Sequence, residues 1–265
     1  MSSAPMNESW GHTLESEFVL ELRDIRAGYG RAALVLRGLT LTVPAGAIVC
    51  VVGPNGAGKS TVLKVASGLL KPRSGQVILD GVDVTGCSPQ QLLASGLAHV
   101  LQGHSVFPEM TVAENVLLGG YIMRDKKEVA ARAEFVRELF PVVAERWGTL
   151  AGLLSGGQQK QVEFARSLMM RPKVVLLDEP SMGLDPKSTA TVFEQVVRMR
   201  DAGTAVLLVE QNARRALQTA DYGCVLDLGT VYVSGPAHEL LADRRLGELY
   251  LGGRPGERTS NASDG

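Results

Sequence analysis

Residues 53–61 read GPNGAGKST and directly follow the apolar run AIVCVV at residues 47–52. They match the pattern G-x-x-x-x-G-K-[ST] at every fixed position. Glycines let the backbone curl so that successive N–H groups point at phosphate oxygens, and the helix expected from Lys59 adds its positive end. In such a loop the lysine bridges the β- and γ-phosphates and the next residue, here Ser60, is a ligand of Mg²⁺. The stretch therefore predicts a nucleoside triphosphate site, not an ordinary glycine-rich turn.

A nucleotide site of this kind needs an acidic partner, and VVLLDEP at residues 174–180 supplies one. The apolar strand ends in Asp178, which we expect to hold Mg²⁺ through water, because Mg²⁺ keeps several of its waters. Glu179, one residue further out, is the candidate that polarises the attacking water. An Asp-Glu pair is common by chance, but after a buried strand and beside a phosphate loop it indicates ATP hydrolysis.

A third motif, LLSGGQQKQVEF, occupies residues 153–164. Ser155 followed three residues later by Gln158 is a capping-box pattern, so helix capping alone would account for it. The two glycines between them leave the helix N-terminus unshielded by side chains, and an anion can then approach its N–H groups. We therefore expect this helix end to contact a nucleotide.

Apolar runs and alternating patterns divide the chain into strands and helices. We predict one α/β domain over residues 18–253, a P-loop NTPase core with an N-terminal antiparallel β region. A helical subdomain over about residues 88–165 is expected to be inserted between two strands of this core. The polar segments 1–17 and 254–265 are expected to be disordered.

Composition excludes several classes of function. Lys and Arg number 27 against 28 Asp and Glu, so there is no bulk basic field to attract nucleic acid. No stretch approaches the roughly 18 apolar residues that span a bilayer. The four histidines have no acidic or cysteine companions at ligand spacing, so no zinc site is indicated. One of them, His104, is interpreted as an exposed loop residue.

Together the motifs resemble those of the ATP-binding subunits of ABC transporters over nearly all of residues 18–253. The matching segments are GPNGAGKST (53–61), LSGGQ (154–158), LLDEP (176–180) and SMGLD (181–185), with Gln102 between the first two. The resemblance implies that two such domains pair head to tail, with each ATP between one phosphate loop and the other subunit's LSGGQ. It also implies that Gln102 contacts metal and water and links the site to a membrane subunit. Asp185 matches the residue that crosses the dimer interface.

Two further positions are interpreted through this resemblance. Tyr29, in AGYG, matches the aromatic residue that stacks on adenine, although an ordinary surface or core tyrosine is the alternative. VLLVEQNA at residues 206–213 ends in three polar residues, which alone would predict a solvated turn. Most ABC ATPases have a γ-phosphate-contacting histidine at the place of Gln211, whereas the ATPases of branched-chain amino acid importers typically have VEQN. We therefore expect Gln211 to contact the γ-phosphate.

FPEMTVAENVLLGG at residues 107–120 and the C-terminal part also resemble this importer branch, but some positions depart from it. Leu101 and His104 stand where proline and arginine are usual, and Asp185 where alanine is frequent. QQKQVEF at residues 158–164 replaces the usual EQQM. These departures leave the transported solute open, because the Gln102 loop faces the membrane subunit.

The leading hypothesis is a peripheral ATPase on the cytoplasmic face of the plasma membrane. It would drive uptake of branched-chain or related hydrophobic amino acids, with a second ABC ATPase, two permease subunits and, indirectly, a solute-binding protein. Alternatives are the same ATPase type serving urea, amides or lipid export, or a non-transport ABC ATPase acting on ribosomes or DNA. The latter usually carry fused ATPase domains, coiled coils or zinc modules, and none is visible here, so no nucleic-acid partner is expected.

The expected ligands are ATP and Mg²⁺. The predicted catalytic residues are Glu179, Gln211 and Gln102, and the predicted metal ligands are Ser60, Gln102 and Asp178. The predicted nucleotide-binding residues are Tyr29, Gly53, Pro54, Asn55, Gly56, Ala57, Gly58, Lys59, Ser60, Thr61, Ser155, Gly156, Gly157, Gln158 and Asp185.

Overall fold

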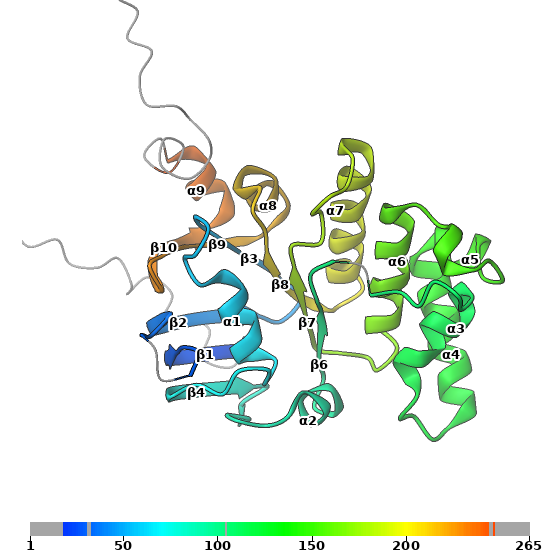
Figure 1. The fold of residues 1–265 in the computed structure, drawn as a ribbon, viewed down its shortest axis with the longest axis horizontal. Coiled ribbons are helices and arrows are strands. Elements are labelled where there is room, and N and C mark those ends of the chain that lie inside the picture. Colours follow the sequence, from blue (N-terminus) through cyan, green and yellow to red (C-terminus); the bar gives the residue numbers. More distant parts are fainter. Residues whose placement is uncertain (1–17, 31–32, 104, 244–245, 247–265) are drawn as a thin grey trace, which may run out of the picture.

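The computed structural model describes residues 18–30, 33–103, 105–243 and 246, which form two sheets and the helices around them (Figure 1). The strands are β1 (Phe18–Ala27), β2 (Leu36–Pro44), β3 (Ile48–Val52), β4 (Ser74–Leu79), β5 (Val82–Asp83), β6 (Leu97–Val100), β7 (Val174–Asp178), β8 (Ala205–Val209), β9 (Tyr222–Asp227) and β10 (Thr230–Pro236). The α-helices are α1 (Lys59–Ala66), α2 (Pro89–Ala94), α3 (Val112–Leu117), α4 (Lys126–Leu139), α5 (Pro141–Glu145), α6 (Gly156–Ser167), α7 (Pro186–Asp201), α8 (Ala213–Thr219) and α9 (Ala237–Ala242). Two 3₁₀ turns, η1 (Leu118–Gly120) and η2 (Ala151–Leu153), complete the elements.

The larger sheet has six strands in the order β10-β9-β3-β8-β7-β6. All its neighbouring strands pair in parallel except β9 and β10, which pair antiparallel at one edge. Every residue of β3, β7 and β8 is buried. Both faces of these central strands are covered, which is why their sequences are apolar throughout and do not alternate.

A smaller antiparallel sheet, in the order β2-β1-β4-β5, confirms the predicted N-terminal β region. Its leucines pack with α1 against one face of the larger sheet, in a core that includes Val49 and Val51 of β3. The alternate residues of β3, Ile48, Cys50 and Val52, face a second core built with the helices on the other side. The larger sheet therefore separates two hydrophobic cores, and α1 lies between the two sheets.

The helices α3 to α6 form the insertion between β6 and β7 (Figure 1). The structure differs from the predicted start near residue 88, because α2 and β6 precede the helices and β6 pairs with β7 in the larger sheet. The run LAHVL at residues 97–101 does indicate a strand, and β6 forms there, so the predicted helical subdomain began too early. β10 and α8 were not predicted, and α8 begins directly after the three polar residues 210–212.

The remaining expectations concern termini and membrane spans. The expectations for residues 1–17, for 254–265 and for His104 lie outside the described residues. None of the helices in the described ranges is long and apolar enough to cross a membrane.

Candidate functional site

The carboxyl ends of four adjacent parallel strands carry the predicted catalytic residues. The phosphate loop follows β3, Glu210 and Gln211 follow β8, and Asp178 with Glu179 lies at the end of β7. Gln102 follows β6 at the sheet edge. Because these strands are neighbours in the order β3-β8-β7-β6, their ends form one continuous row. This edge is where open parallel sheets bind ligands.

The phosphate loop requires glycine for geometric reasons. Gly53 has φ 151°, and a Cβ there would lie 2.1 Å from the carbonyl oxygen of Leu226. Gly58 has φ 106° and precedes α1, which begins at Lys59 as predicted. The loop, Glu179 and Val35 line a hollow of about 370 Å³. The backbone N–H groups of the loop and the N-terminal end of α1 therefore meet at a space suited to phosphate oxygens.

The Lys59 side chain lies across the loop and is almost completely buried. Its Nζ donates hydrogen bonds to the carbonyl oxygens of Gly53, at 2.9 Å, and Pro54, at 3.1 Å. Burial lowers the pKa of Lys59, and the carboxylates of Glu179 and Asp178 oppose this shift. The charged ammonium is thus held between the loop and two acidic groups, as a bridge to a bound anion requires.

Ser60 and Asp178 supply oxygen atoms that fit a divalent cation. The Ser60 hydroxyl donates to Asp178 Oδ1 at 3.3 Å. Burial raises the pKa of Asp178, because desolvation disfavours its charged form and the neighbouring Glu179 adds repulsion. The described residues contain no group of three or more His, Cys, Asp or Glu side chains that could hold a metal by themselves. One carboxylate and one hydroxyl, completed by water and phosphate, is the donor set that Mg²⁺ takes.

Glu179 adopts a left-handed backbone conformation, with φ 46°. For a residue other than glycine this conformation is uncommon and costs about 1–3 kcal/mol, and among the predicted site residues only Glu179 and glycines have a positive φ. Its N–H donates to the carbonyl oxygen of Val209 at 2.9 Å, which ties the turn to β8. The Gln102 amide donates to Glu179 Oε2 at 3.1 Å, so two residues 77 positions apart meet beside the hollow.

The three polar residues after β8 make three different kinds of contact. Gln211 Nε2 lies 3.4 Å from Oδ1 of Asn55, which places the predicted γ-phosphate residue beside the phosphate loop. Asn212 caps α8 by accepting a hydrogen bond from the Arg215 N–H at 3.1 Å. Glu210 is buried and accepts from the N–H of Ser181 at 3.0 Å. The cluster is therefore more than a solvated turn, and beyond the γ-phosphate contact predicted for Gln211 it contains a helix cap and a buried carboxylate.

Glu210 is the residue of this site that the sequence analysis passed over. Burial raises the pKa of its carboxyl, against the opposing hydrogen bonds from Ser181 and Gln211. Its hydrogen bond with Ser181 connects the end of β8 to the segment that follows Glu179 and fixes the two relative to each other. A carboxylate attached directly to a fully apolar strand was the signal available, since such a group must find buried partners.

Tyr29 lies beside α1, next to Thr61 at the end of the GPNGAGKST segment. Its ring is about half exposed, with Lys64 Nζ 5.5 Å from the ring centroid. Its hydroxyl is 3.4 Å from Thr61 Oγ1. An open aromatic face next to the phosphate site fits the predicted adenine contact.

The LSGGQ residues are not brought to the phosphate loop of the same chain. In Figure 1, α6 lies on the far side of α7 from α1. Ser155 and Gln158 form the reciprocal capping box that their spacing predicts, at 3.4 and 3.0 Å, and the nucleotide contact expected at this helix end stays a prediction. A Cβ on Gly157 would lie 2.9 Å from the Cβ of Ser188, so this glycine also permits close packing of α6 on α7.

Asp185 is exposed and caps α7 by accepting from the N–H groups of Lys187 and Ser188, at 2.9 and 3.0 Å. The hydrogen bonds from Ser188 lower the pKa of its carboxyl. In the described part of the chain, no hydrogen bond or ion pair links Asp185 or the LSGGQ residues to the phosphate loop.

The chain is similar to known proteins over most of its length. Residues 36–182 match the family model described as ABC transporter. The high-affinity branched-chain amino acid transport ATP-binding protein BraG of Pseudomonas aeruginosa is 37% identical, covering 89% of this chain and 100% of BraG. The probable branched-chain amino acid transport ATP-binding protein LivF of Archaeoglobus fulgidus is 36% identical, over 87% of this chain and 98% of LivF. A crystal structure of the ADP conformation of an ATP-binding cassette superposes with a TM-score of 0.80 at 29% identity, covering 89% of this chain and 99% of that one.

Proposed function

The chain belongs to the ABC transporter family as an ATP-binding, ATP-hydrolysing subunit, and on that premise we propose that it energises amino acid uptake through separate membrane subunits. Branched-chain and related hydrophobic amino acids are the proposed solutes. The support is the similarity to BraG and LivF over nearly their whole length. The VEQN segment and the segment at residues 107–120 support the same branch.

The contact between Gln102 and Glu179 beside the phosphate-loop hollow carries the proposal for catalysis. Glu179 acts as the general base that polarises the attacking water, since its side chain lines the space where a γ-phosphate would lie. Lys59 and the loop N–H groups hold the phosphates and stabilise the negative charge that develops on them. Gln102 orients the Glu179 carboxylate through its amide.

Gln211 donates a neutral hydrogen bond to the γ-phosphate from the loop side, near Asn55. Tyr29 stacks on the adenine. Ser60 and Asp178, with Gln102 nearby, would hold Mg²⁺, which supplies positive charge to the phosphate oxygens when bound.

A second ATPase subunit, a copy of this chain or a related one, completes each ATP site. Ser155 and Asp185 are both exposed, and their segments lie away from the phosphate loop of their own chain. In a head-to-tail pair the helix end at Ser155 faces the partner's nucleotide, where its dipole favours negative charge. Asp185 then lies at the interface between the two subunits.

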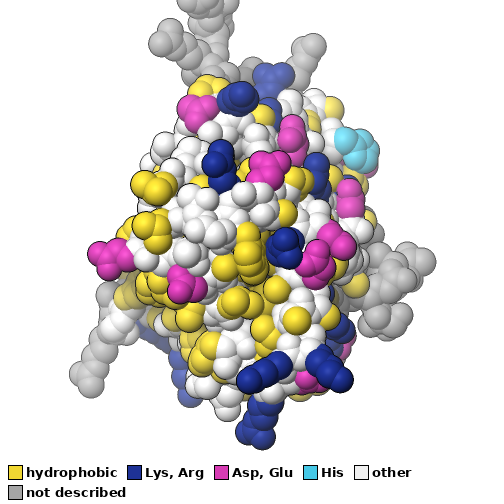
Figure 2. Space-filling model, turned by 90° about the vertical axis from the view of Figure 1, so that its right-hand side faces the viewer, with side chains coloured by type: hydrophobic (Ala, Val, Ile, Leu, Met, Phe, Trp, Pro, Cys, Tyr) yellow, Lys and Arg dark blue, Asp and Glu magenta, His cyan; other side chains and the backbone are white. Residues whose placement is uncertain are grey.

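The membrane subunits contact the face beside Gln102. A largely apolar cavity of about 330 Å³ lies there, and its lining includes Leu101, Tyr121 and Leu69, each about half exposed or more. Figure 2 shows hydrophobic side chains gathered over the middle and lower part of the adjoining helical face. An apolar cavity next to the residue that orients the catalytic base is a suitable seat for a permease segment, because binding there can change hydrolysis. The complex would hold the chain at the cytoplasmic face of the membrane.

Uptake of radiolabelled leucine by a strain lacking this chain tests the proposed solute. The wild-type chain should restore uptake, whereas Lys59→Ala and Glu179→Gln should not. The Glu134→Ala variant, which changes an exposed residue of α4, is the matched control and should restore uptake. Recovery of ATPase activity in the complex without leucine uptake would favour another solute, and co-purification with ribosomes or DNA would reject the transport proposal.

A further inference from the structure

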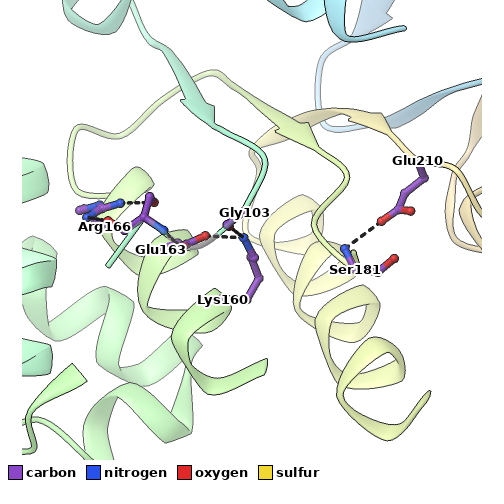
Figure 3. A network of polar contacts seen from close by, with 7 residues as sticks. Gly103, Lys160, Glu163, Arg166, Ser181 and Glu210 are labelled. Atoms are coloured by element: carbon purple, nitrogen blue, oxygen red, sulfur yellow. Dashed lines mark hydrogen bonds and ion pairs between the residues drawn. The ribbon is translucent and has the colours of Figure 1, made fainter. Parts of the chain in front are cut away.

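Three side chains of α6 form hydrogen bonds with the backbone of the segment that follows Gln102 (Figure 3). Lys160 Nζ donates to the carbonyl oxygen of Gly103 at 2.7 Å. Glu163 Oε1 accepts from the N–H of Ser105, and Arg166 donates to the carbonyl oxygen of the same Ser105 at 2.8 Å. The residues on both sides of position 104 are therefore attached to one helix.

Lys160 and Glu163 also form an ion pair with each other, and their side chains are 3% and 0% exposed. A buried ion pair is seldom the most stabilising choice, because the desolvation penalty offsets much of the attraction. Its geometry is nevertheless strongly specified, since neither charge can move away from its partner without becoming unpaired in the interior. The pair is thus suited to fixing the position of the segment it binds.

The segment bound by α6 leads directly to the catalytic groups. Gln102 immediately precedes Gly103, and its amide nitrogen contacts Glu179 Oε2 at 3.1 Å and Met182 Sδ at 3.0 Å. Gln102 is exposed and follows the edge strand β6, so the sheet supports it from one side only. The α6 contacts provide the second support.

We propose that Lys160 and Glu163 are positioning residues for ATP hydrolysis, which hold Gly103 and Ser105 on α6 so that the Gln102 amide stays on the Glu179 carboxylate. This inference rests on the proposed roles of Gln102 and Glu179. Because α6 begins at the LSGGQ end, the same contacts join the helix that faces the partner's nucleotide to the catalytic base of this chain's own site. Neither side chain touches the phosphate loop, so their role is to place Gln102 and not to bind ATP.

The test is steady-state ATPase kinetics of the full chain in its assembled transporter, with Glu163→Ala as the main variant. The expected result is a kcat about tenfold or more below wild type, with KM for ATP within about twofold, since misplacing a group near the reacting atoms lowers turnover. The kcat of Glu163→Gln should lie between those of wild type and Glu163→Ala, because its amide oxygen can still accept a hydrogen bond from the N–H of Ser105. Glu134→Ala is the matched control, since it removes the carboxylate of an exposed i,i+3 pair on α4, and it should leave both constants unchanged.

A double-mutant cycle with Gln102→Ala separates positioning from general loss of structure. In the Gln102→Ala background, Glu163→Ala should cause no further decrease in kcat, because its effect passes through Gln102. Equal decreases with and without Gln102, or a kcat for Glu163→Ala matching that of Glu134→Ala, would overturn the proposal. If Glu163→Ala does not fold, Lys160→Met combined with Glu163→Gln removes both charges of the Lys160–Glu163 pair together with the Gly103 contact, and it is subject to the same cycle.

The proposed function is tested separately in these assays. If the wild type hydrolyses ATP and Glu179→Gln does not, the proposed function is supported, and if Glu179→Gln still hydrolyses ATP, it is contradicted. The positioning role is judged only from Glu163→Ala against wild type, so the two proposals can fail independently.

Discussion

Replacing His99 should reduce the acid sensitivity of this fold. His99 lies on the edge strand β6 and faces the cavity beside Gln102. Both of its ring nitrogens are buried without a hydrogen-bond partner. Burial lowers the pKa of His99 to about 4, and the positive charge of Lys64 acts in the same direction. The folded protein therefore keeps this imidazole neutral at pH values where an unfolded chain would protonate it.

The direction and the magnitude of this effect on stability follow from the pKa values of His99 in the unfolded and the folded state. An unperturbed histidine has a pKa of about 6.5, so between pH 6.5 and 4 the unfolded state binds the proton and the folded state does not. Stability is then lost as the pH falls from about 6.5 through 4. From pH 7 to pH 4.5 a shift to about 4 corresponds to about 2 kcal/mol of lost stability from this residue.

Urea unfolding of the isolated chain at a series of pH values measures this contribution. The difference in unfolding free energy between His99→Phe and wild type should grow by about 2 kcal/mol in favour of the variant between pH 7 and 4.5. His238→Gln removes an exposed histidine of α9 and is the matched control. A difference between His99→Phe and wild type that stays constant over this pH range would refute the reasoning, since it would mean that His99 has the same pKa in both states.

Five substitutions at four residues of the nucleotide site give distinct results. Glu179→Gln should cut ATP turnover by about 10²–10⁴ while keeping ATP affinity, because only the general base is lost, as turnover and equilibrium ATP binding together would show. Lys59→Ala should instead weaken equilibrium ATP binding, and unchanged affinity would count against the phosphate-loop assignment. Gln211→His should remain active and gain a pH-dependent step near 6.5 in its ATPase profile, whereas Gln211→Ala should lose turnover at all pH values, though less than Glu179→Gln. Gly53→Ala should lower stability by about 1–3 kcal/mol in urea unfolding, because its Cβ would meet the Leu226 carbonyl oxygen 2.1 Å away at φ 151°.

Local sequence was sufficient for those parts of this protein whose geometry is set by residues close together in the chain. GPNGAGKST after an apolar strand predicted the loop, the start of α1 at Lys59 and the burial of β3. The Ser155 capping box formed as its spacing requires. In each case the turn and the helix cap are built from neighbouring backbone groups, so a short pattern contains the information.

The arrangement of the proposed catalytic groups depended on tertiary structure. Gln102 meets Glu179, 77 positions away, only because β6 pairs with β7 at the edge of the sheet. Other contacts likewise join elements that are distant in the chain. They are the hydrogen bond between Glu210 and Ser181 and those of Lys160 and Glu163 with the segment after Gln102. Periodicity shows that a residue is buried but not which residue it faces. That choice follows from strand order, register and helix packing, which the whole chain determines together.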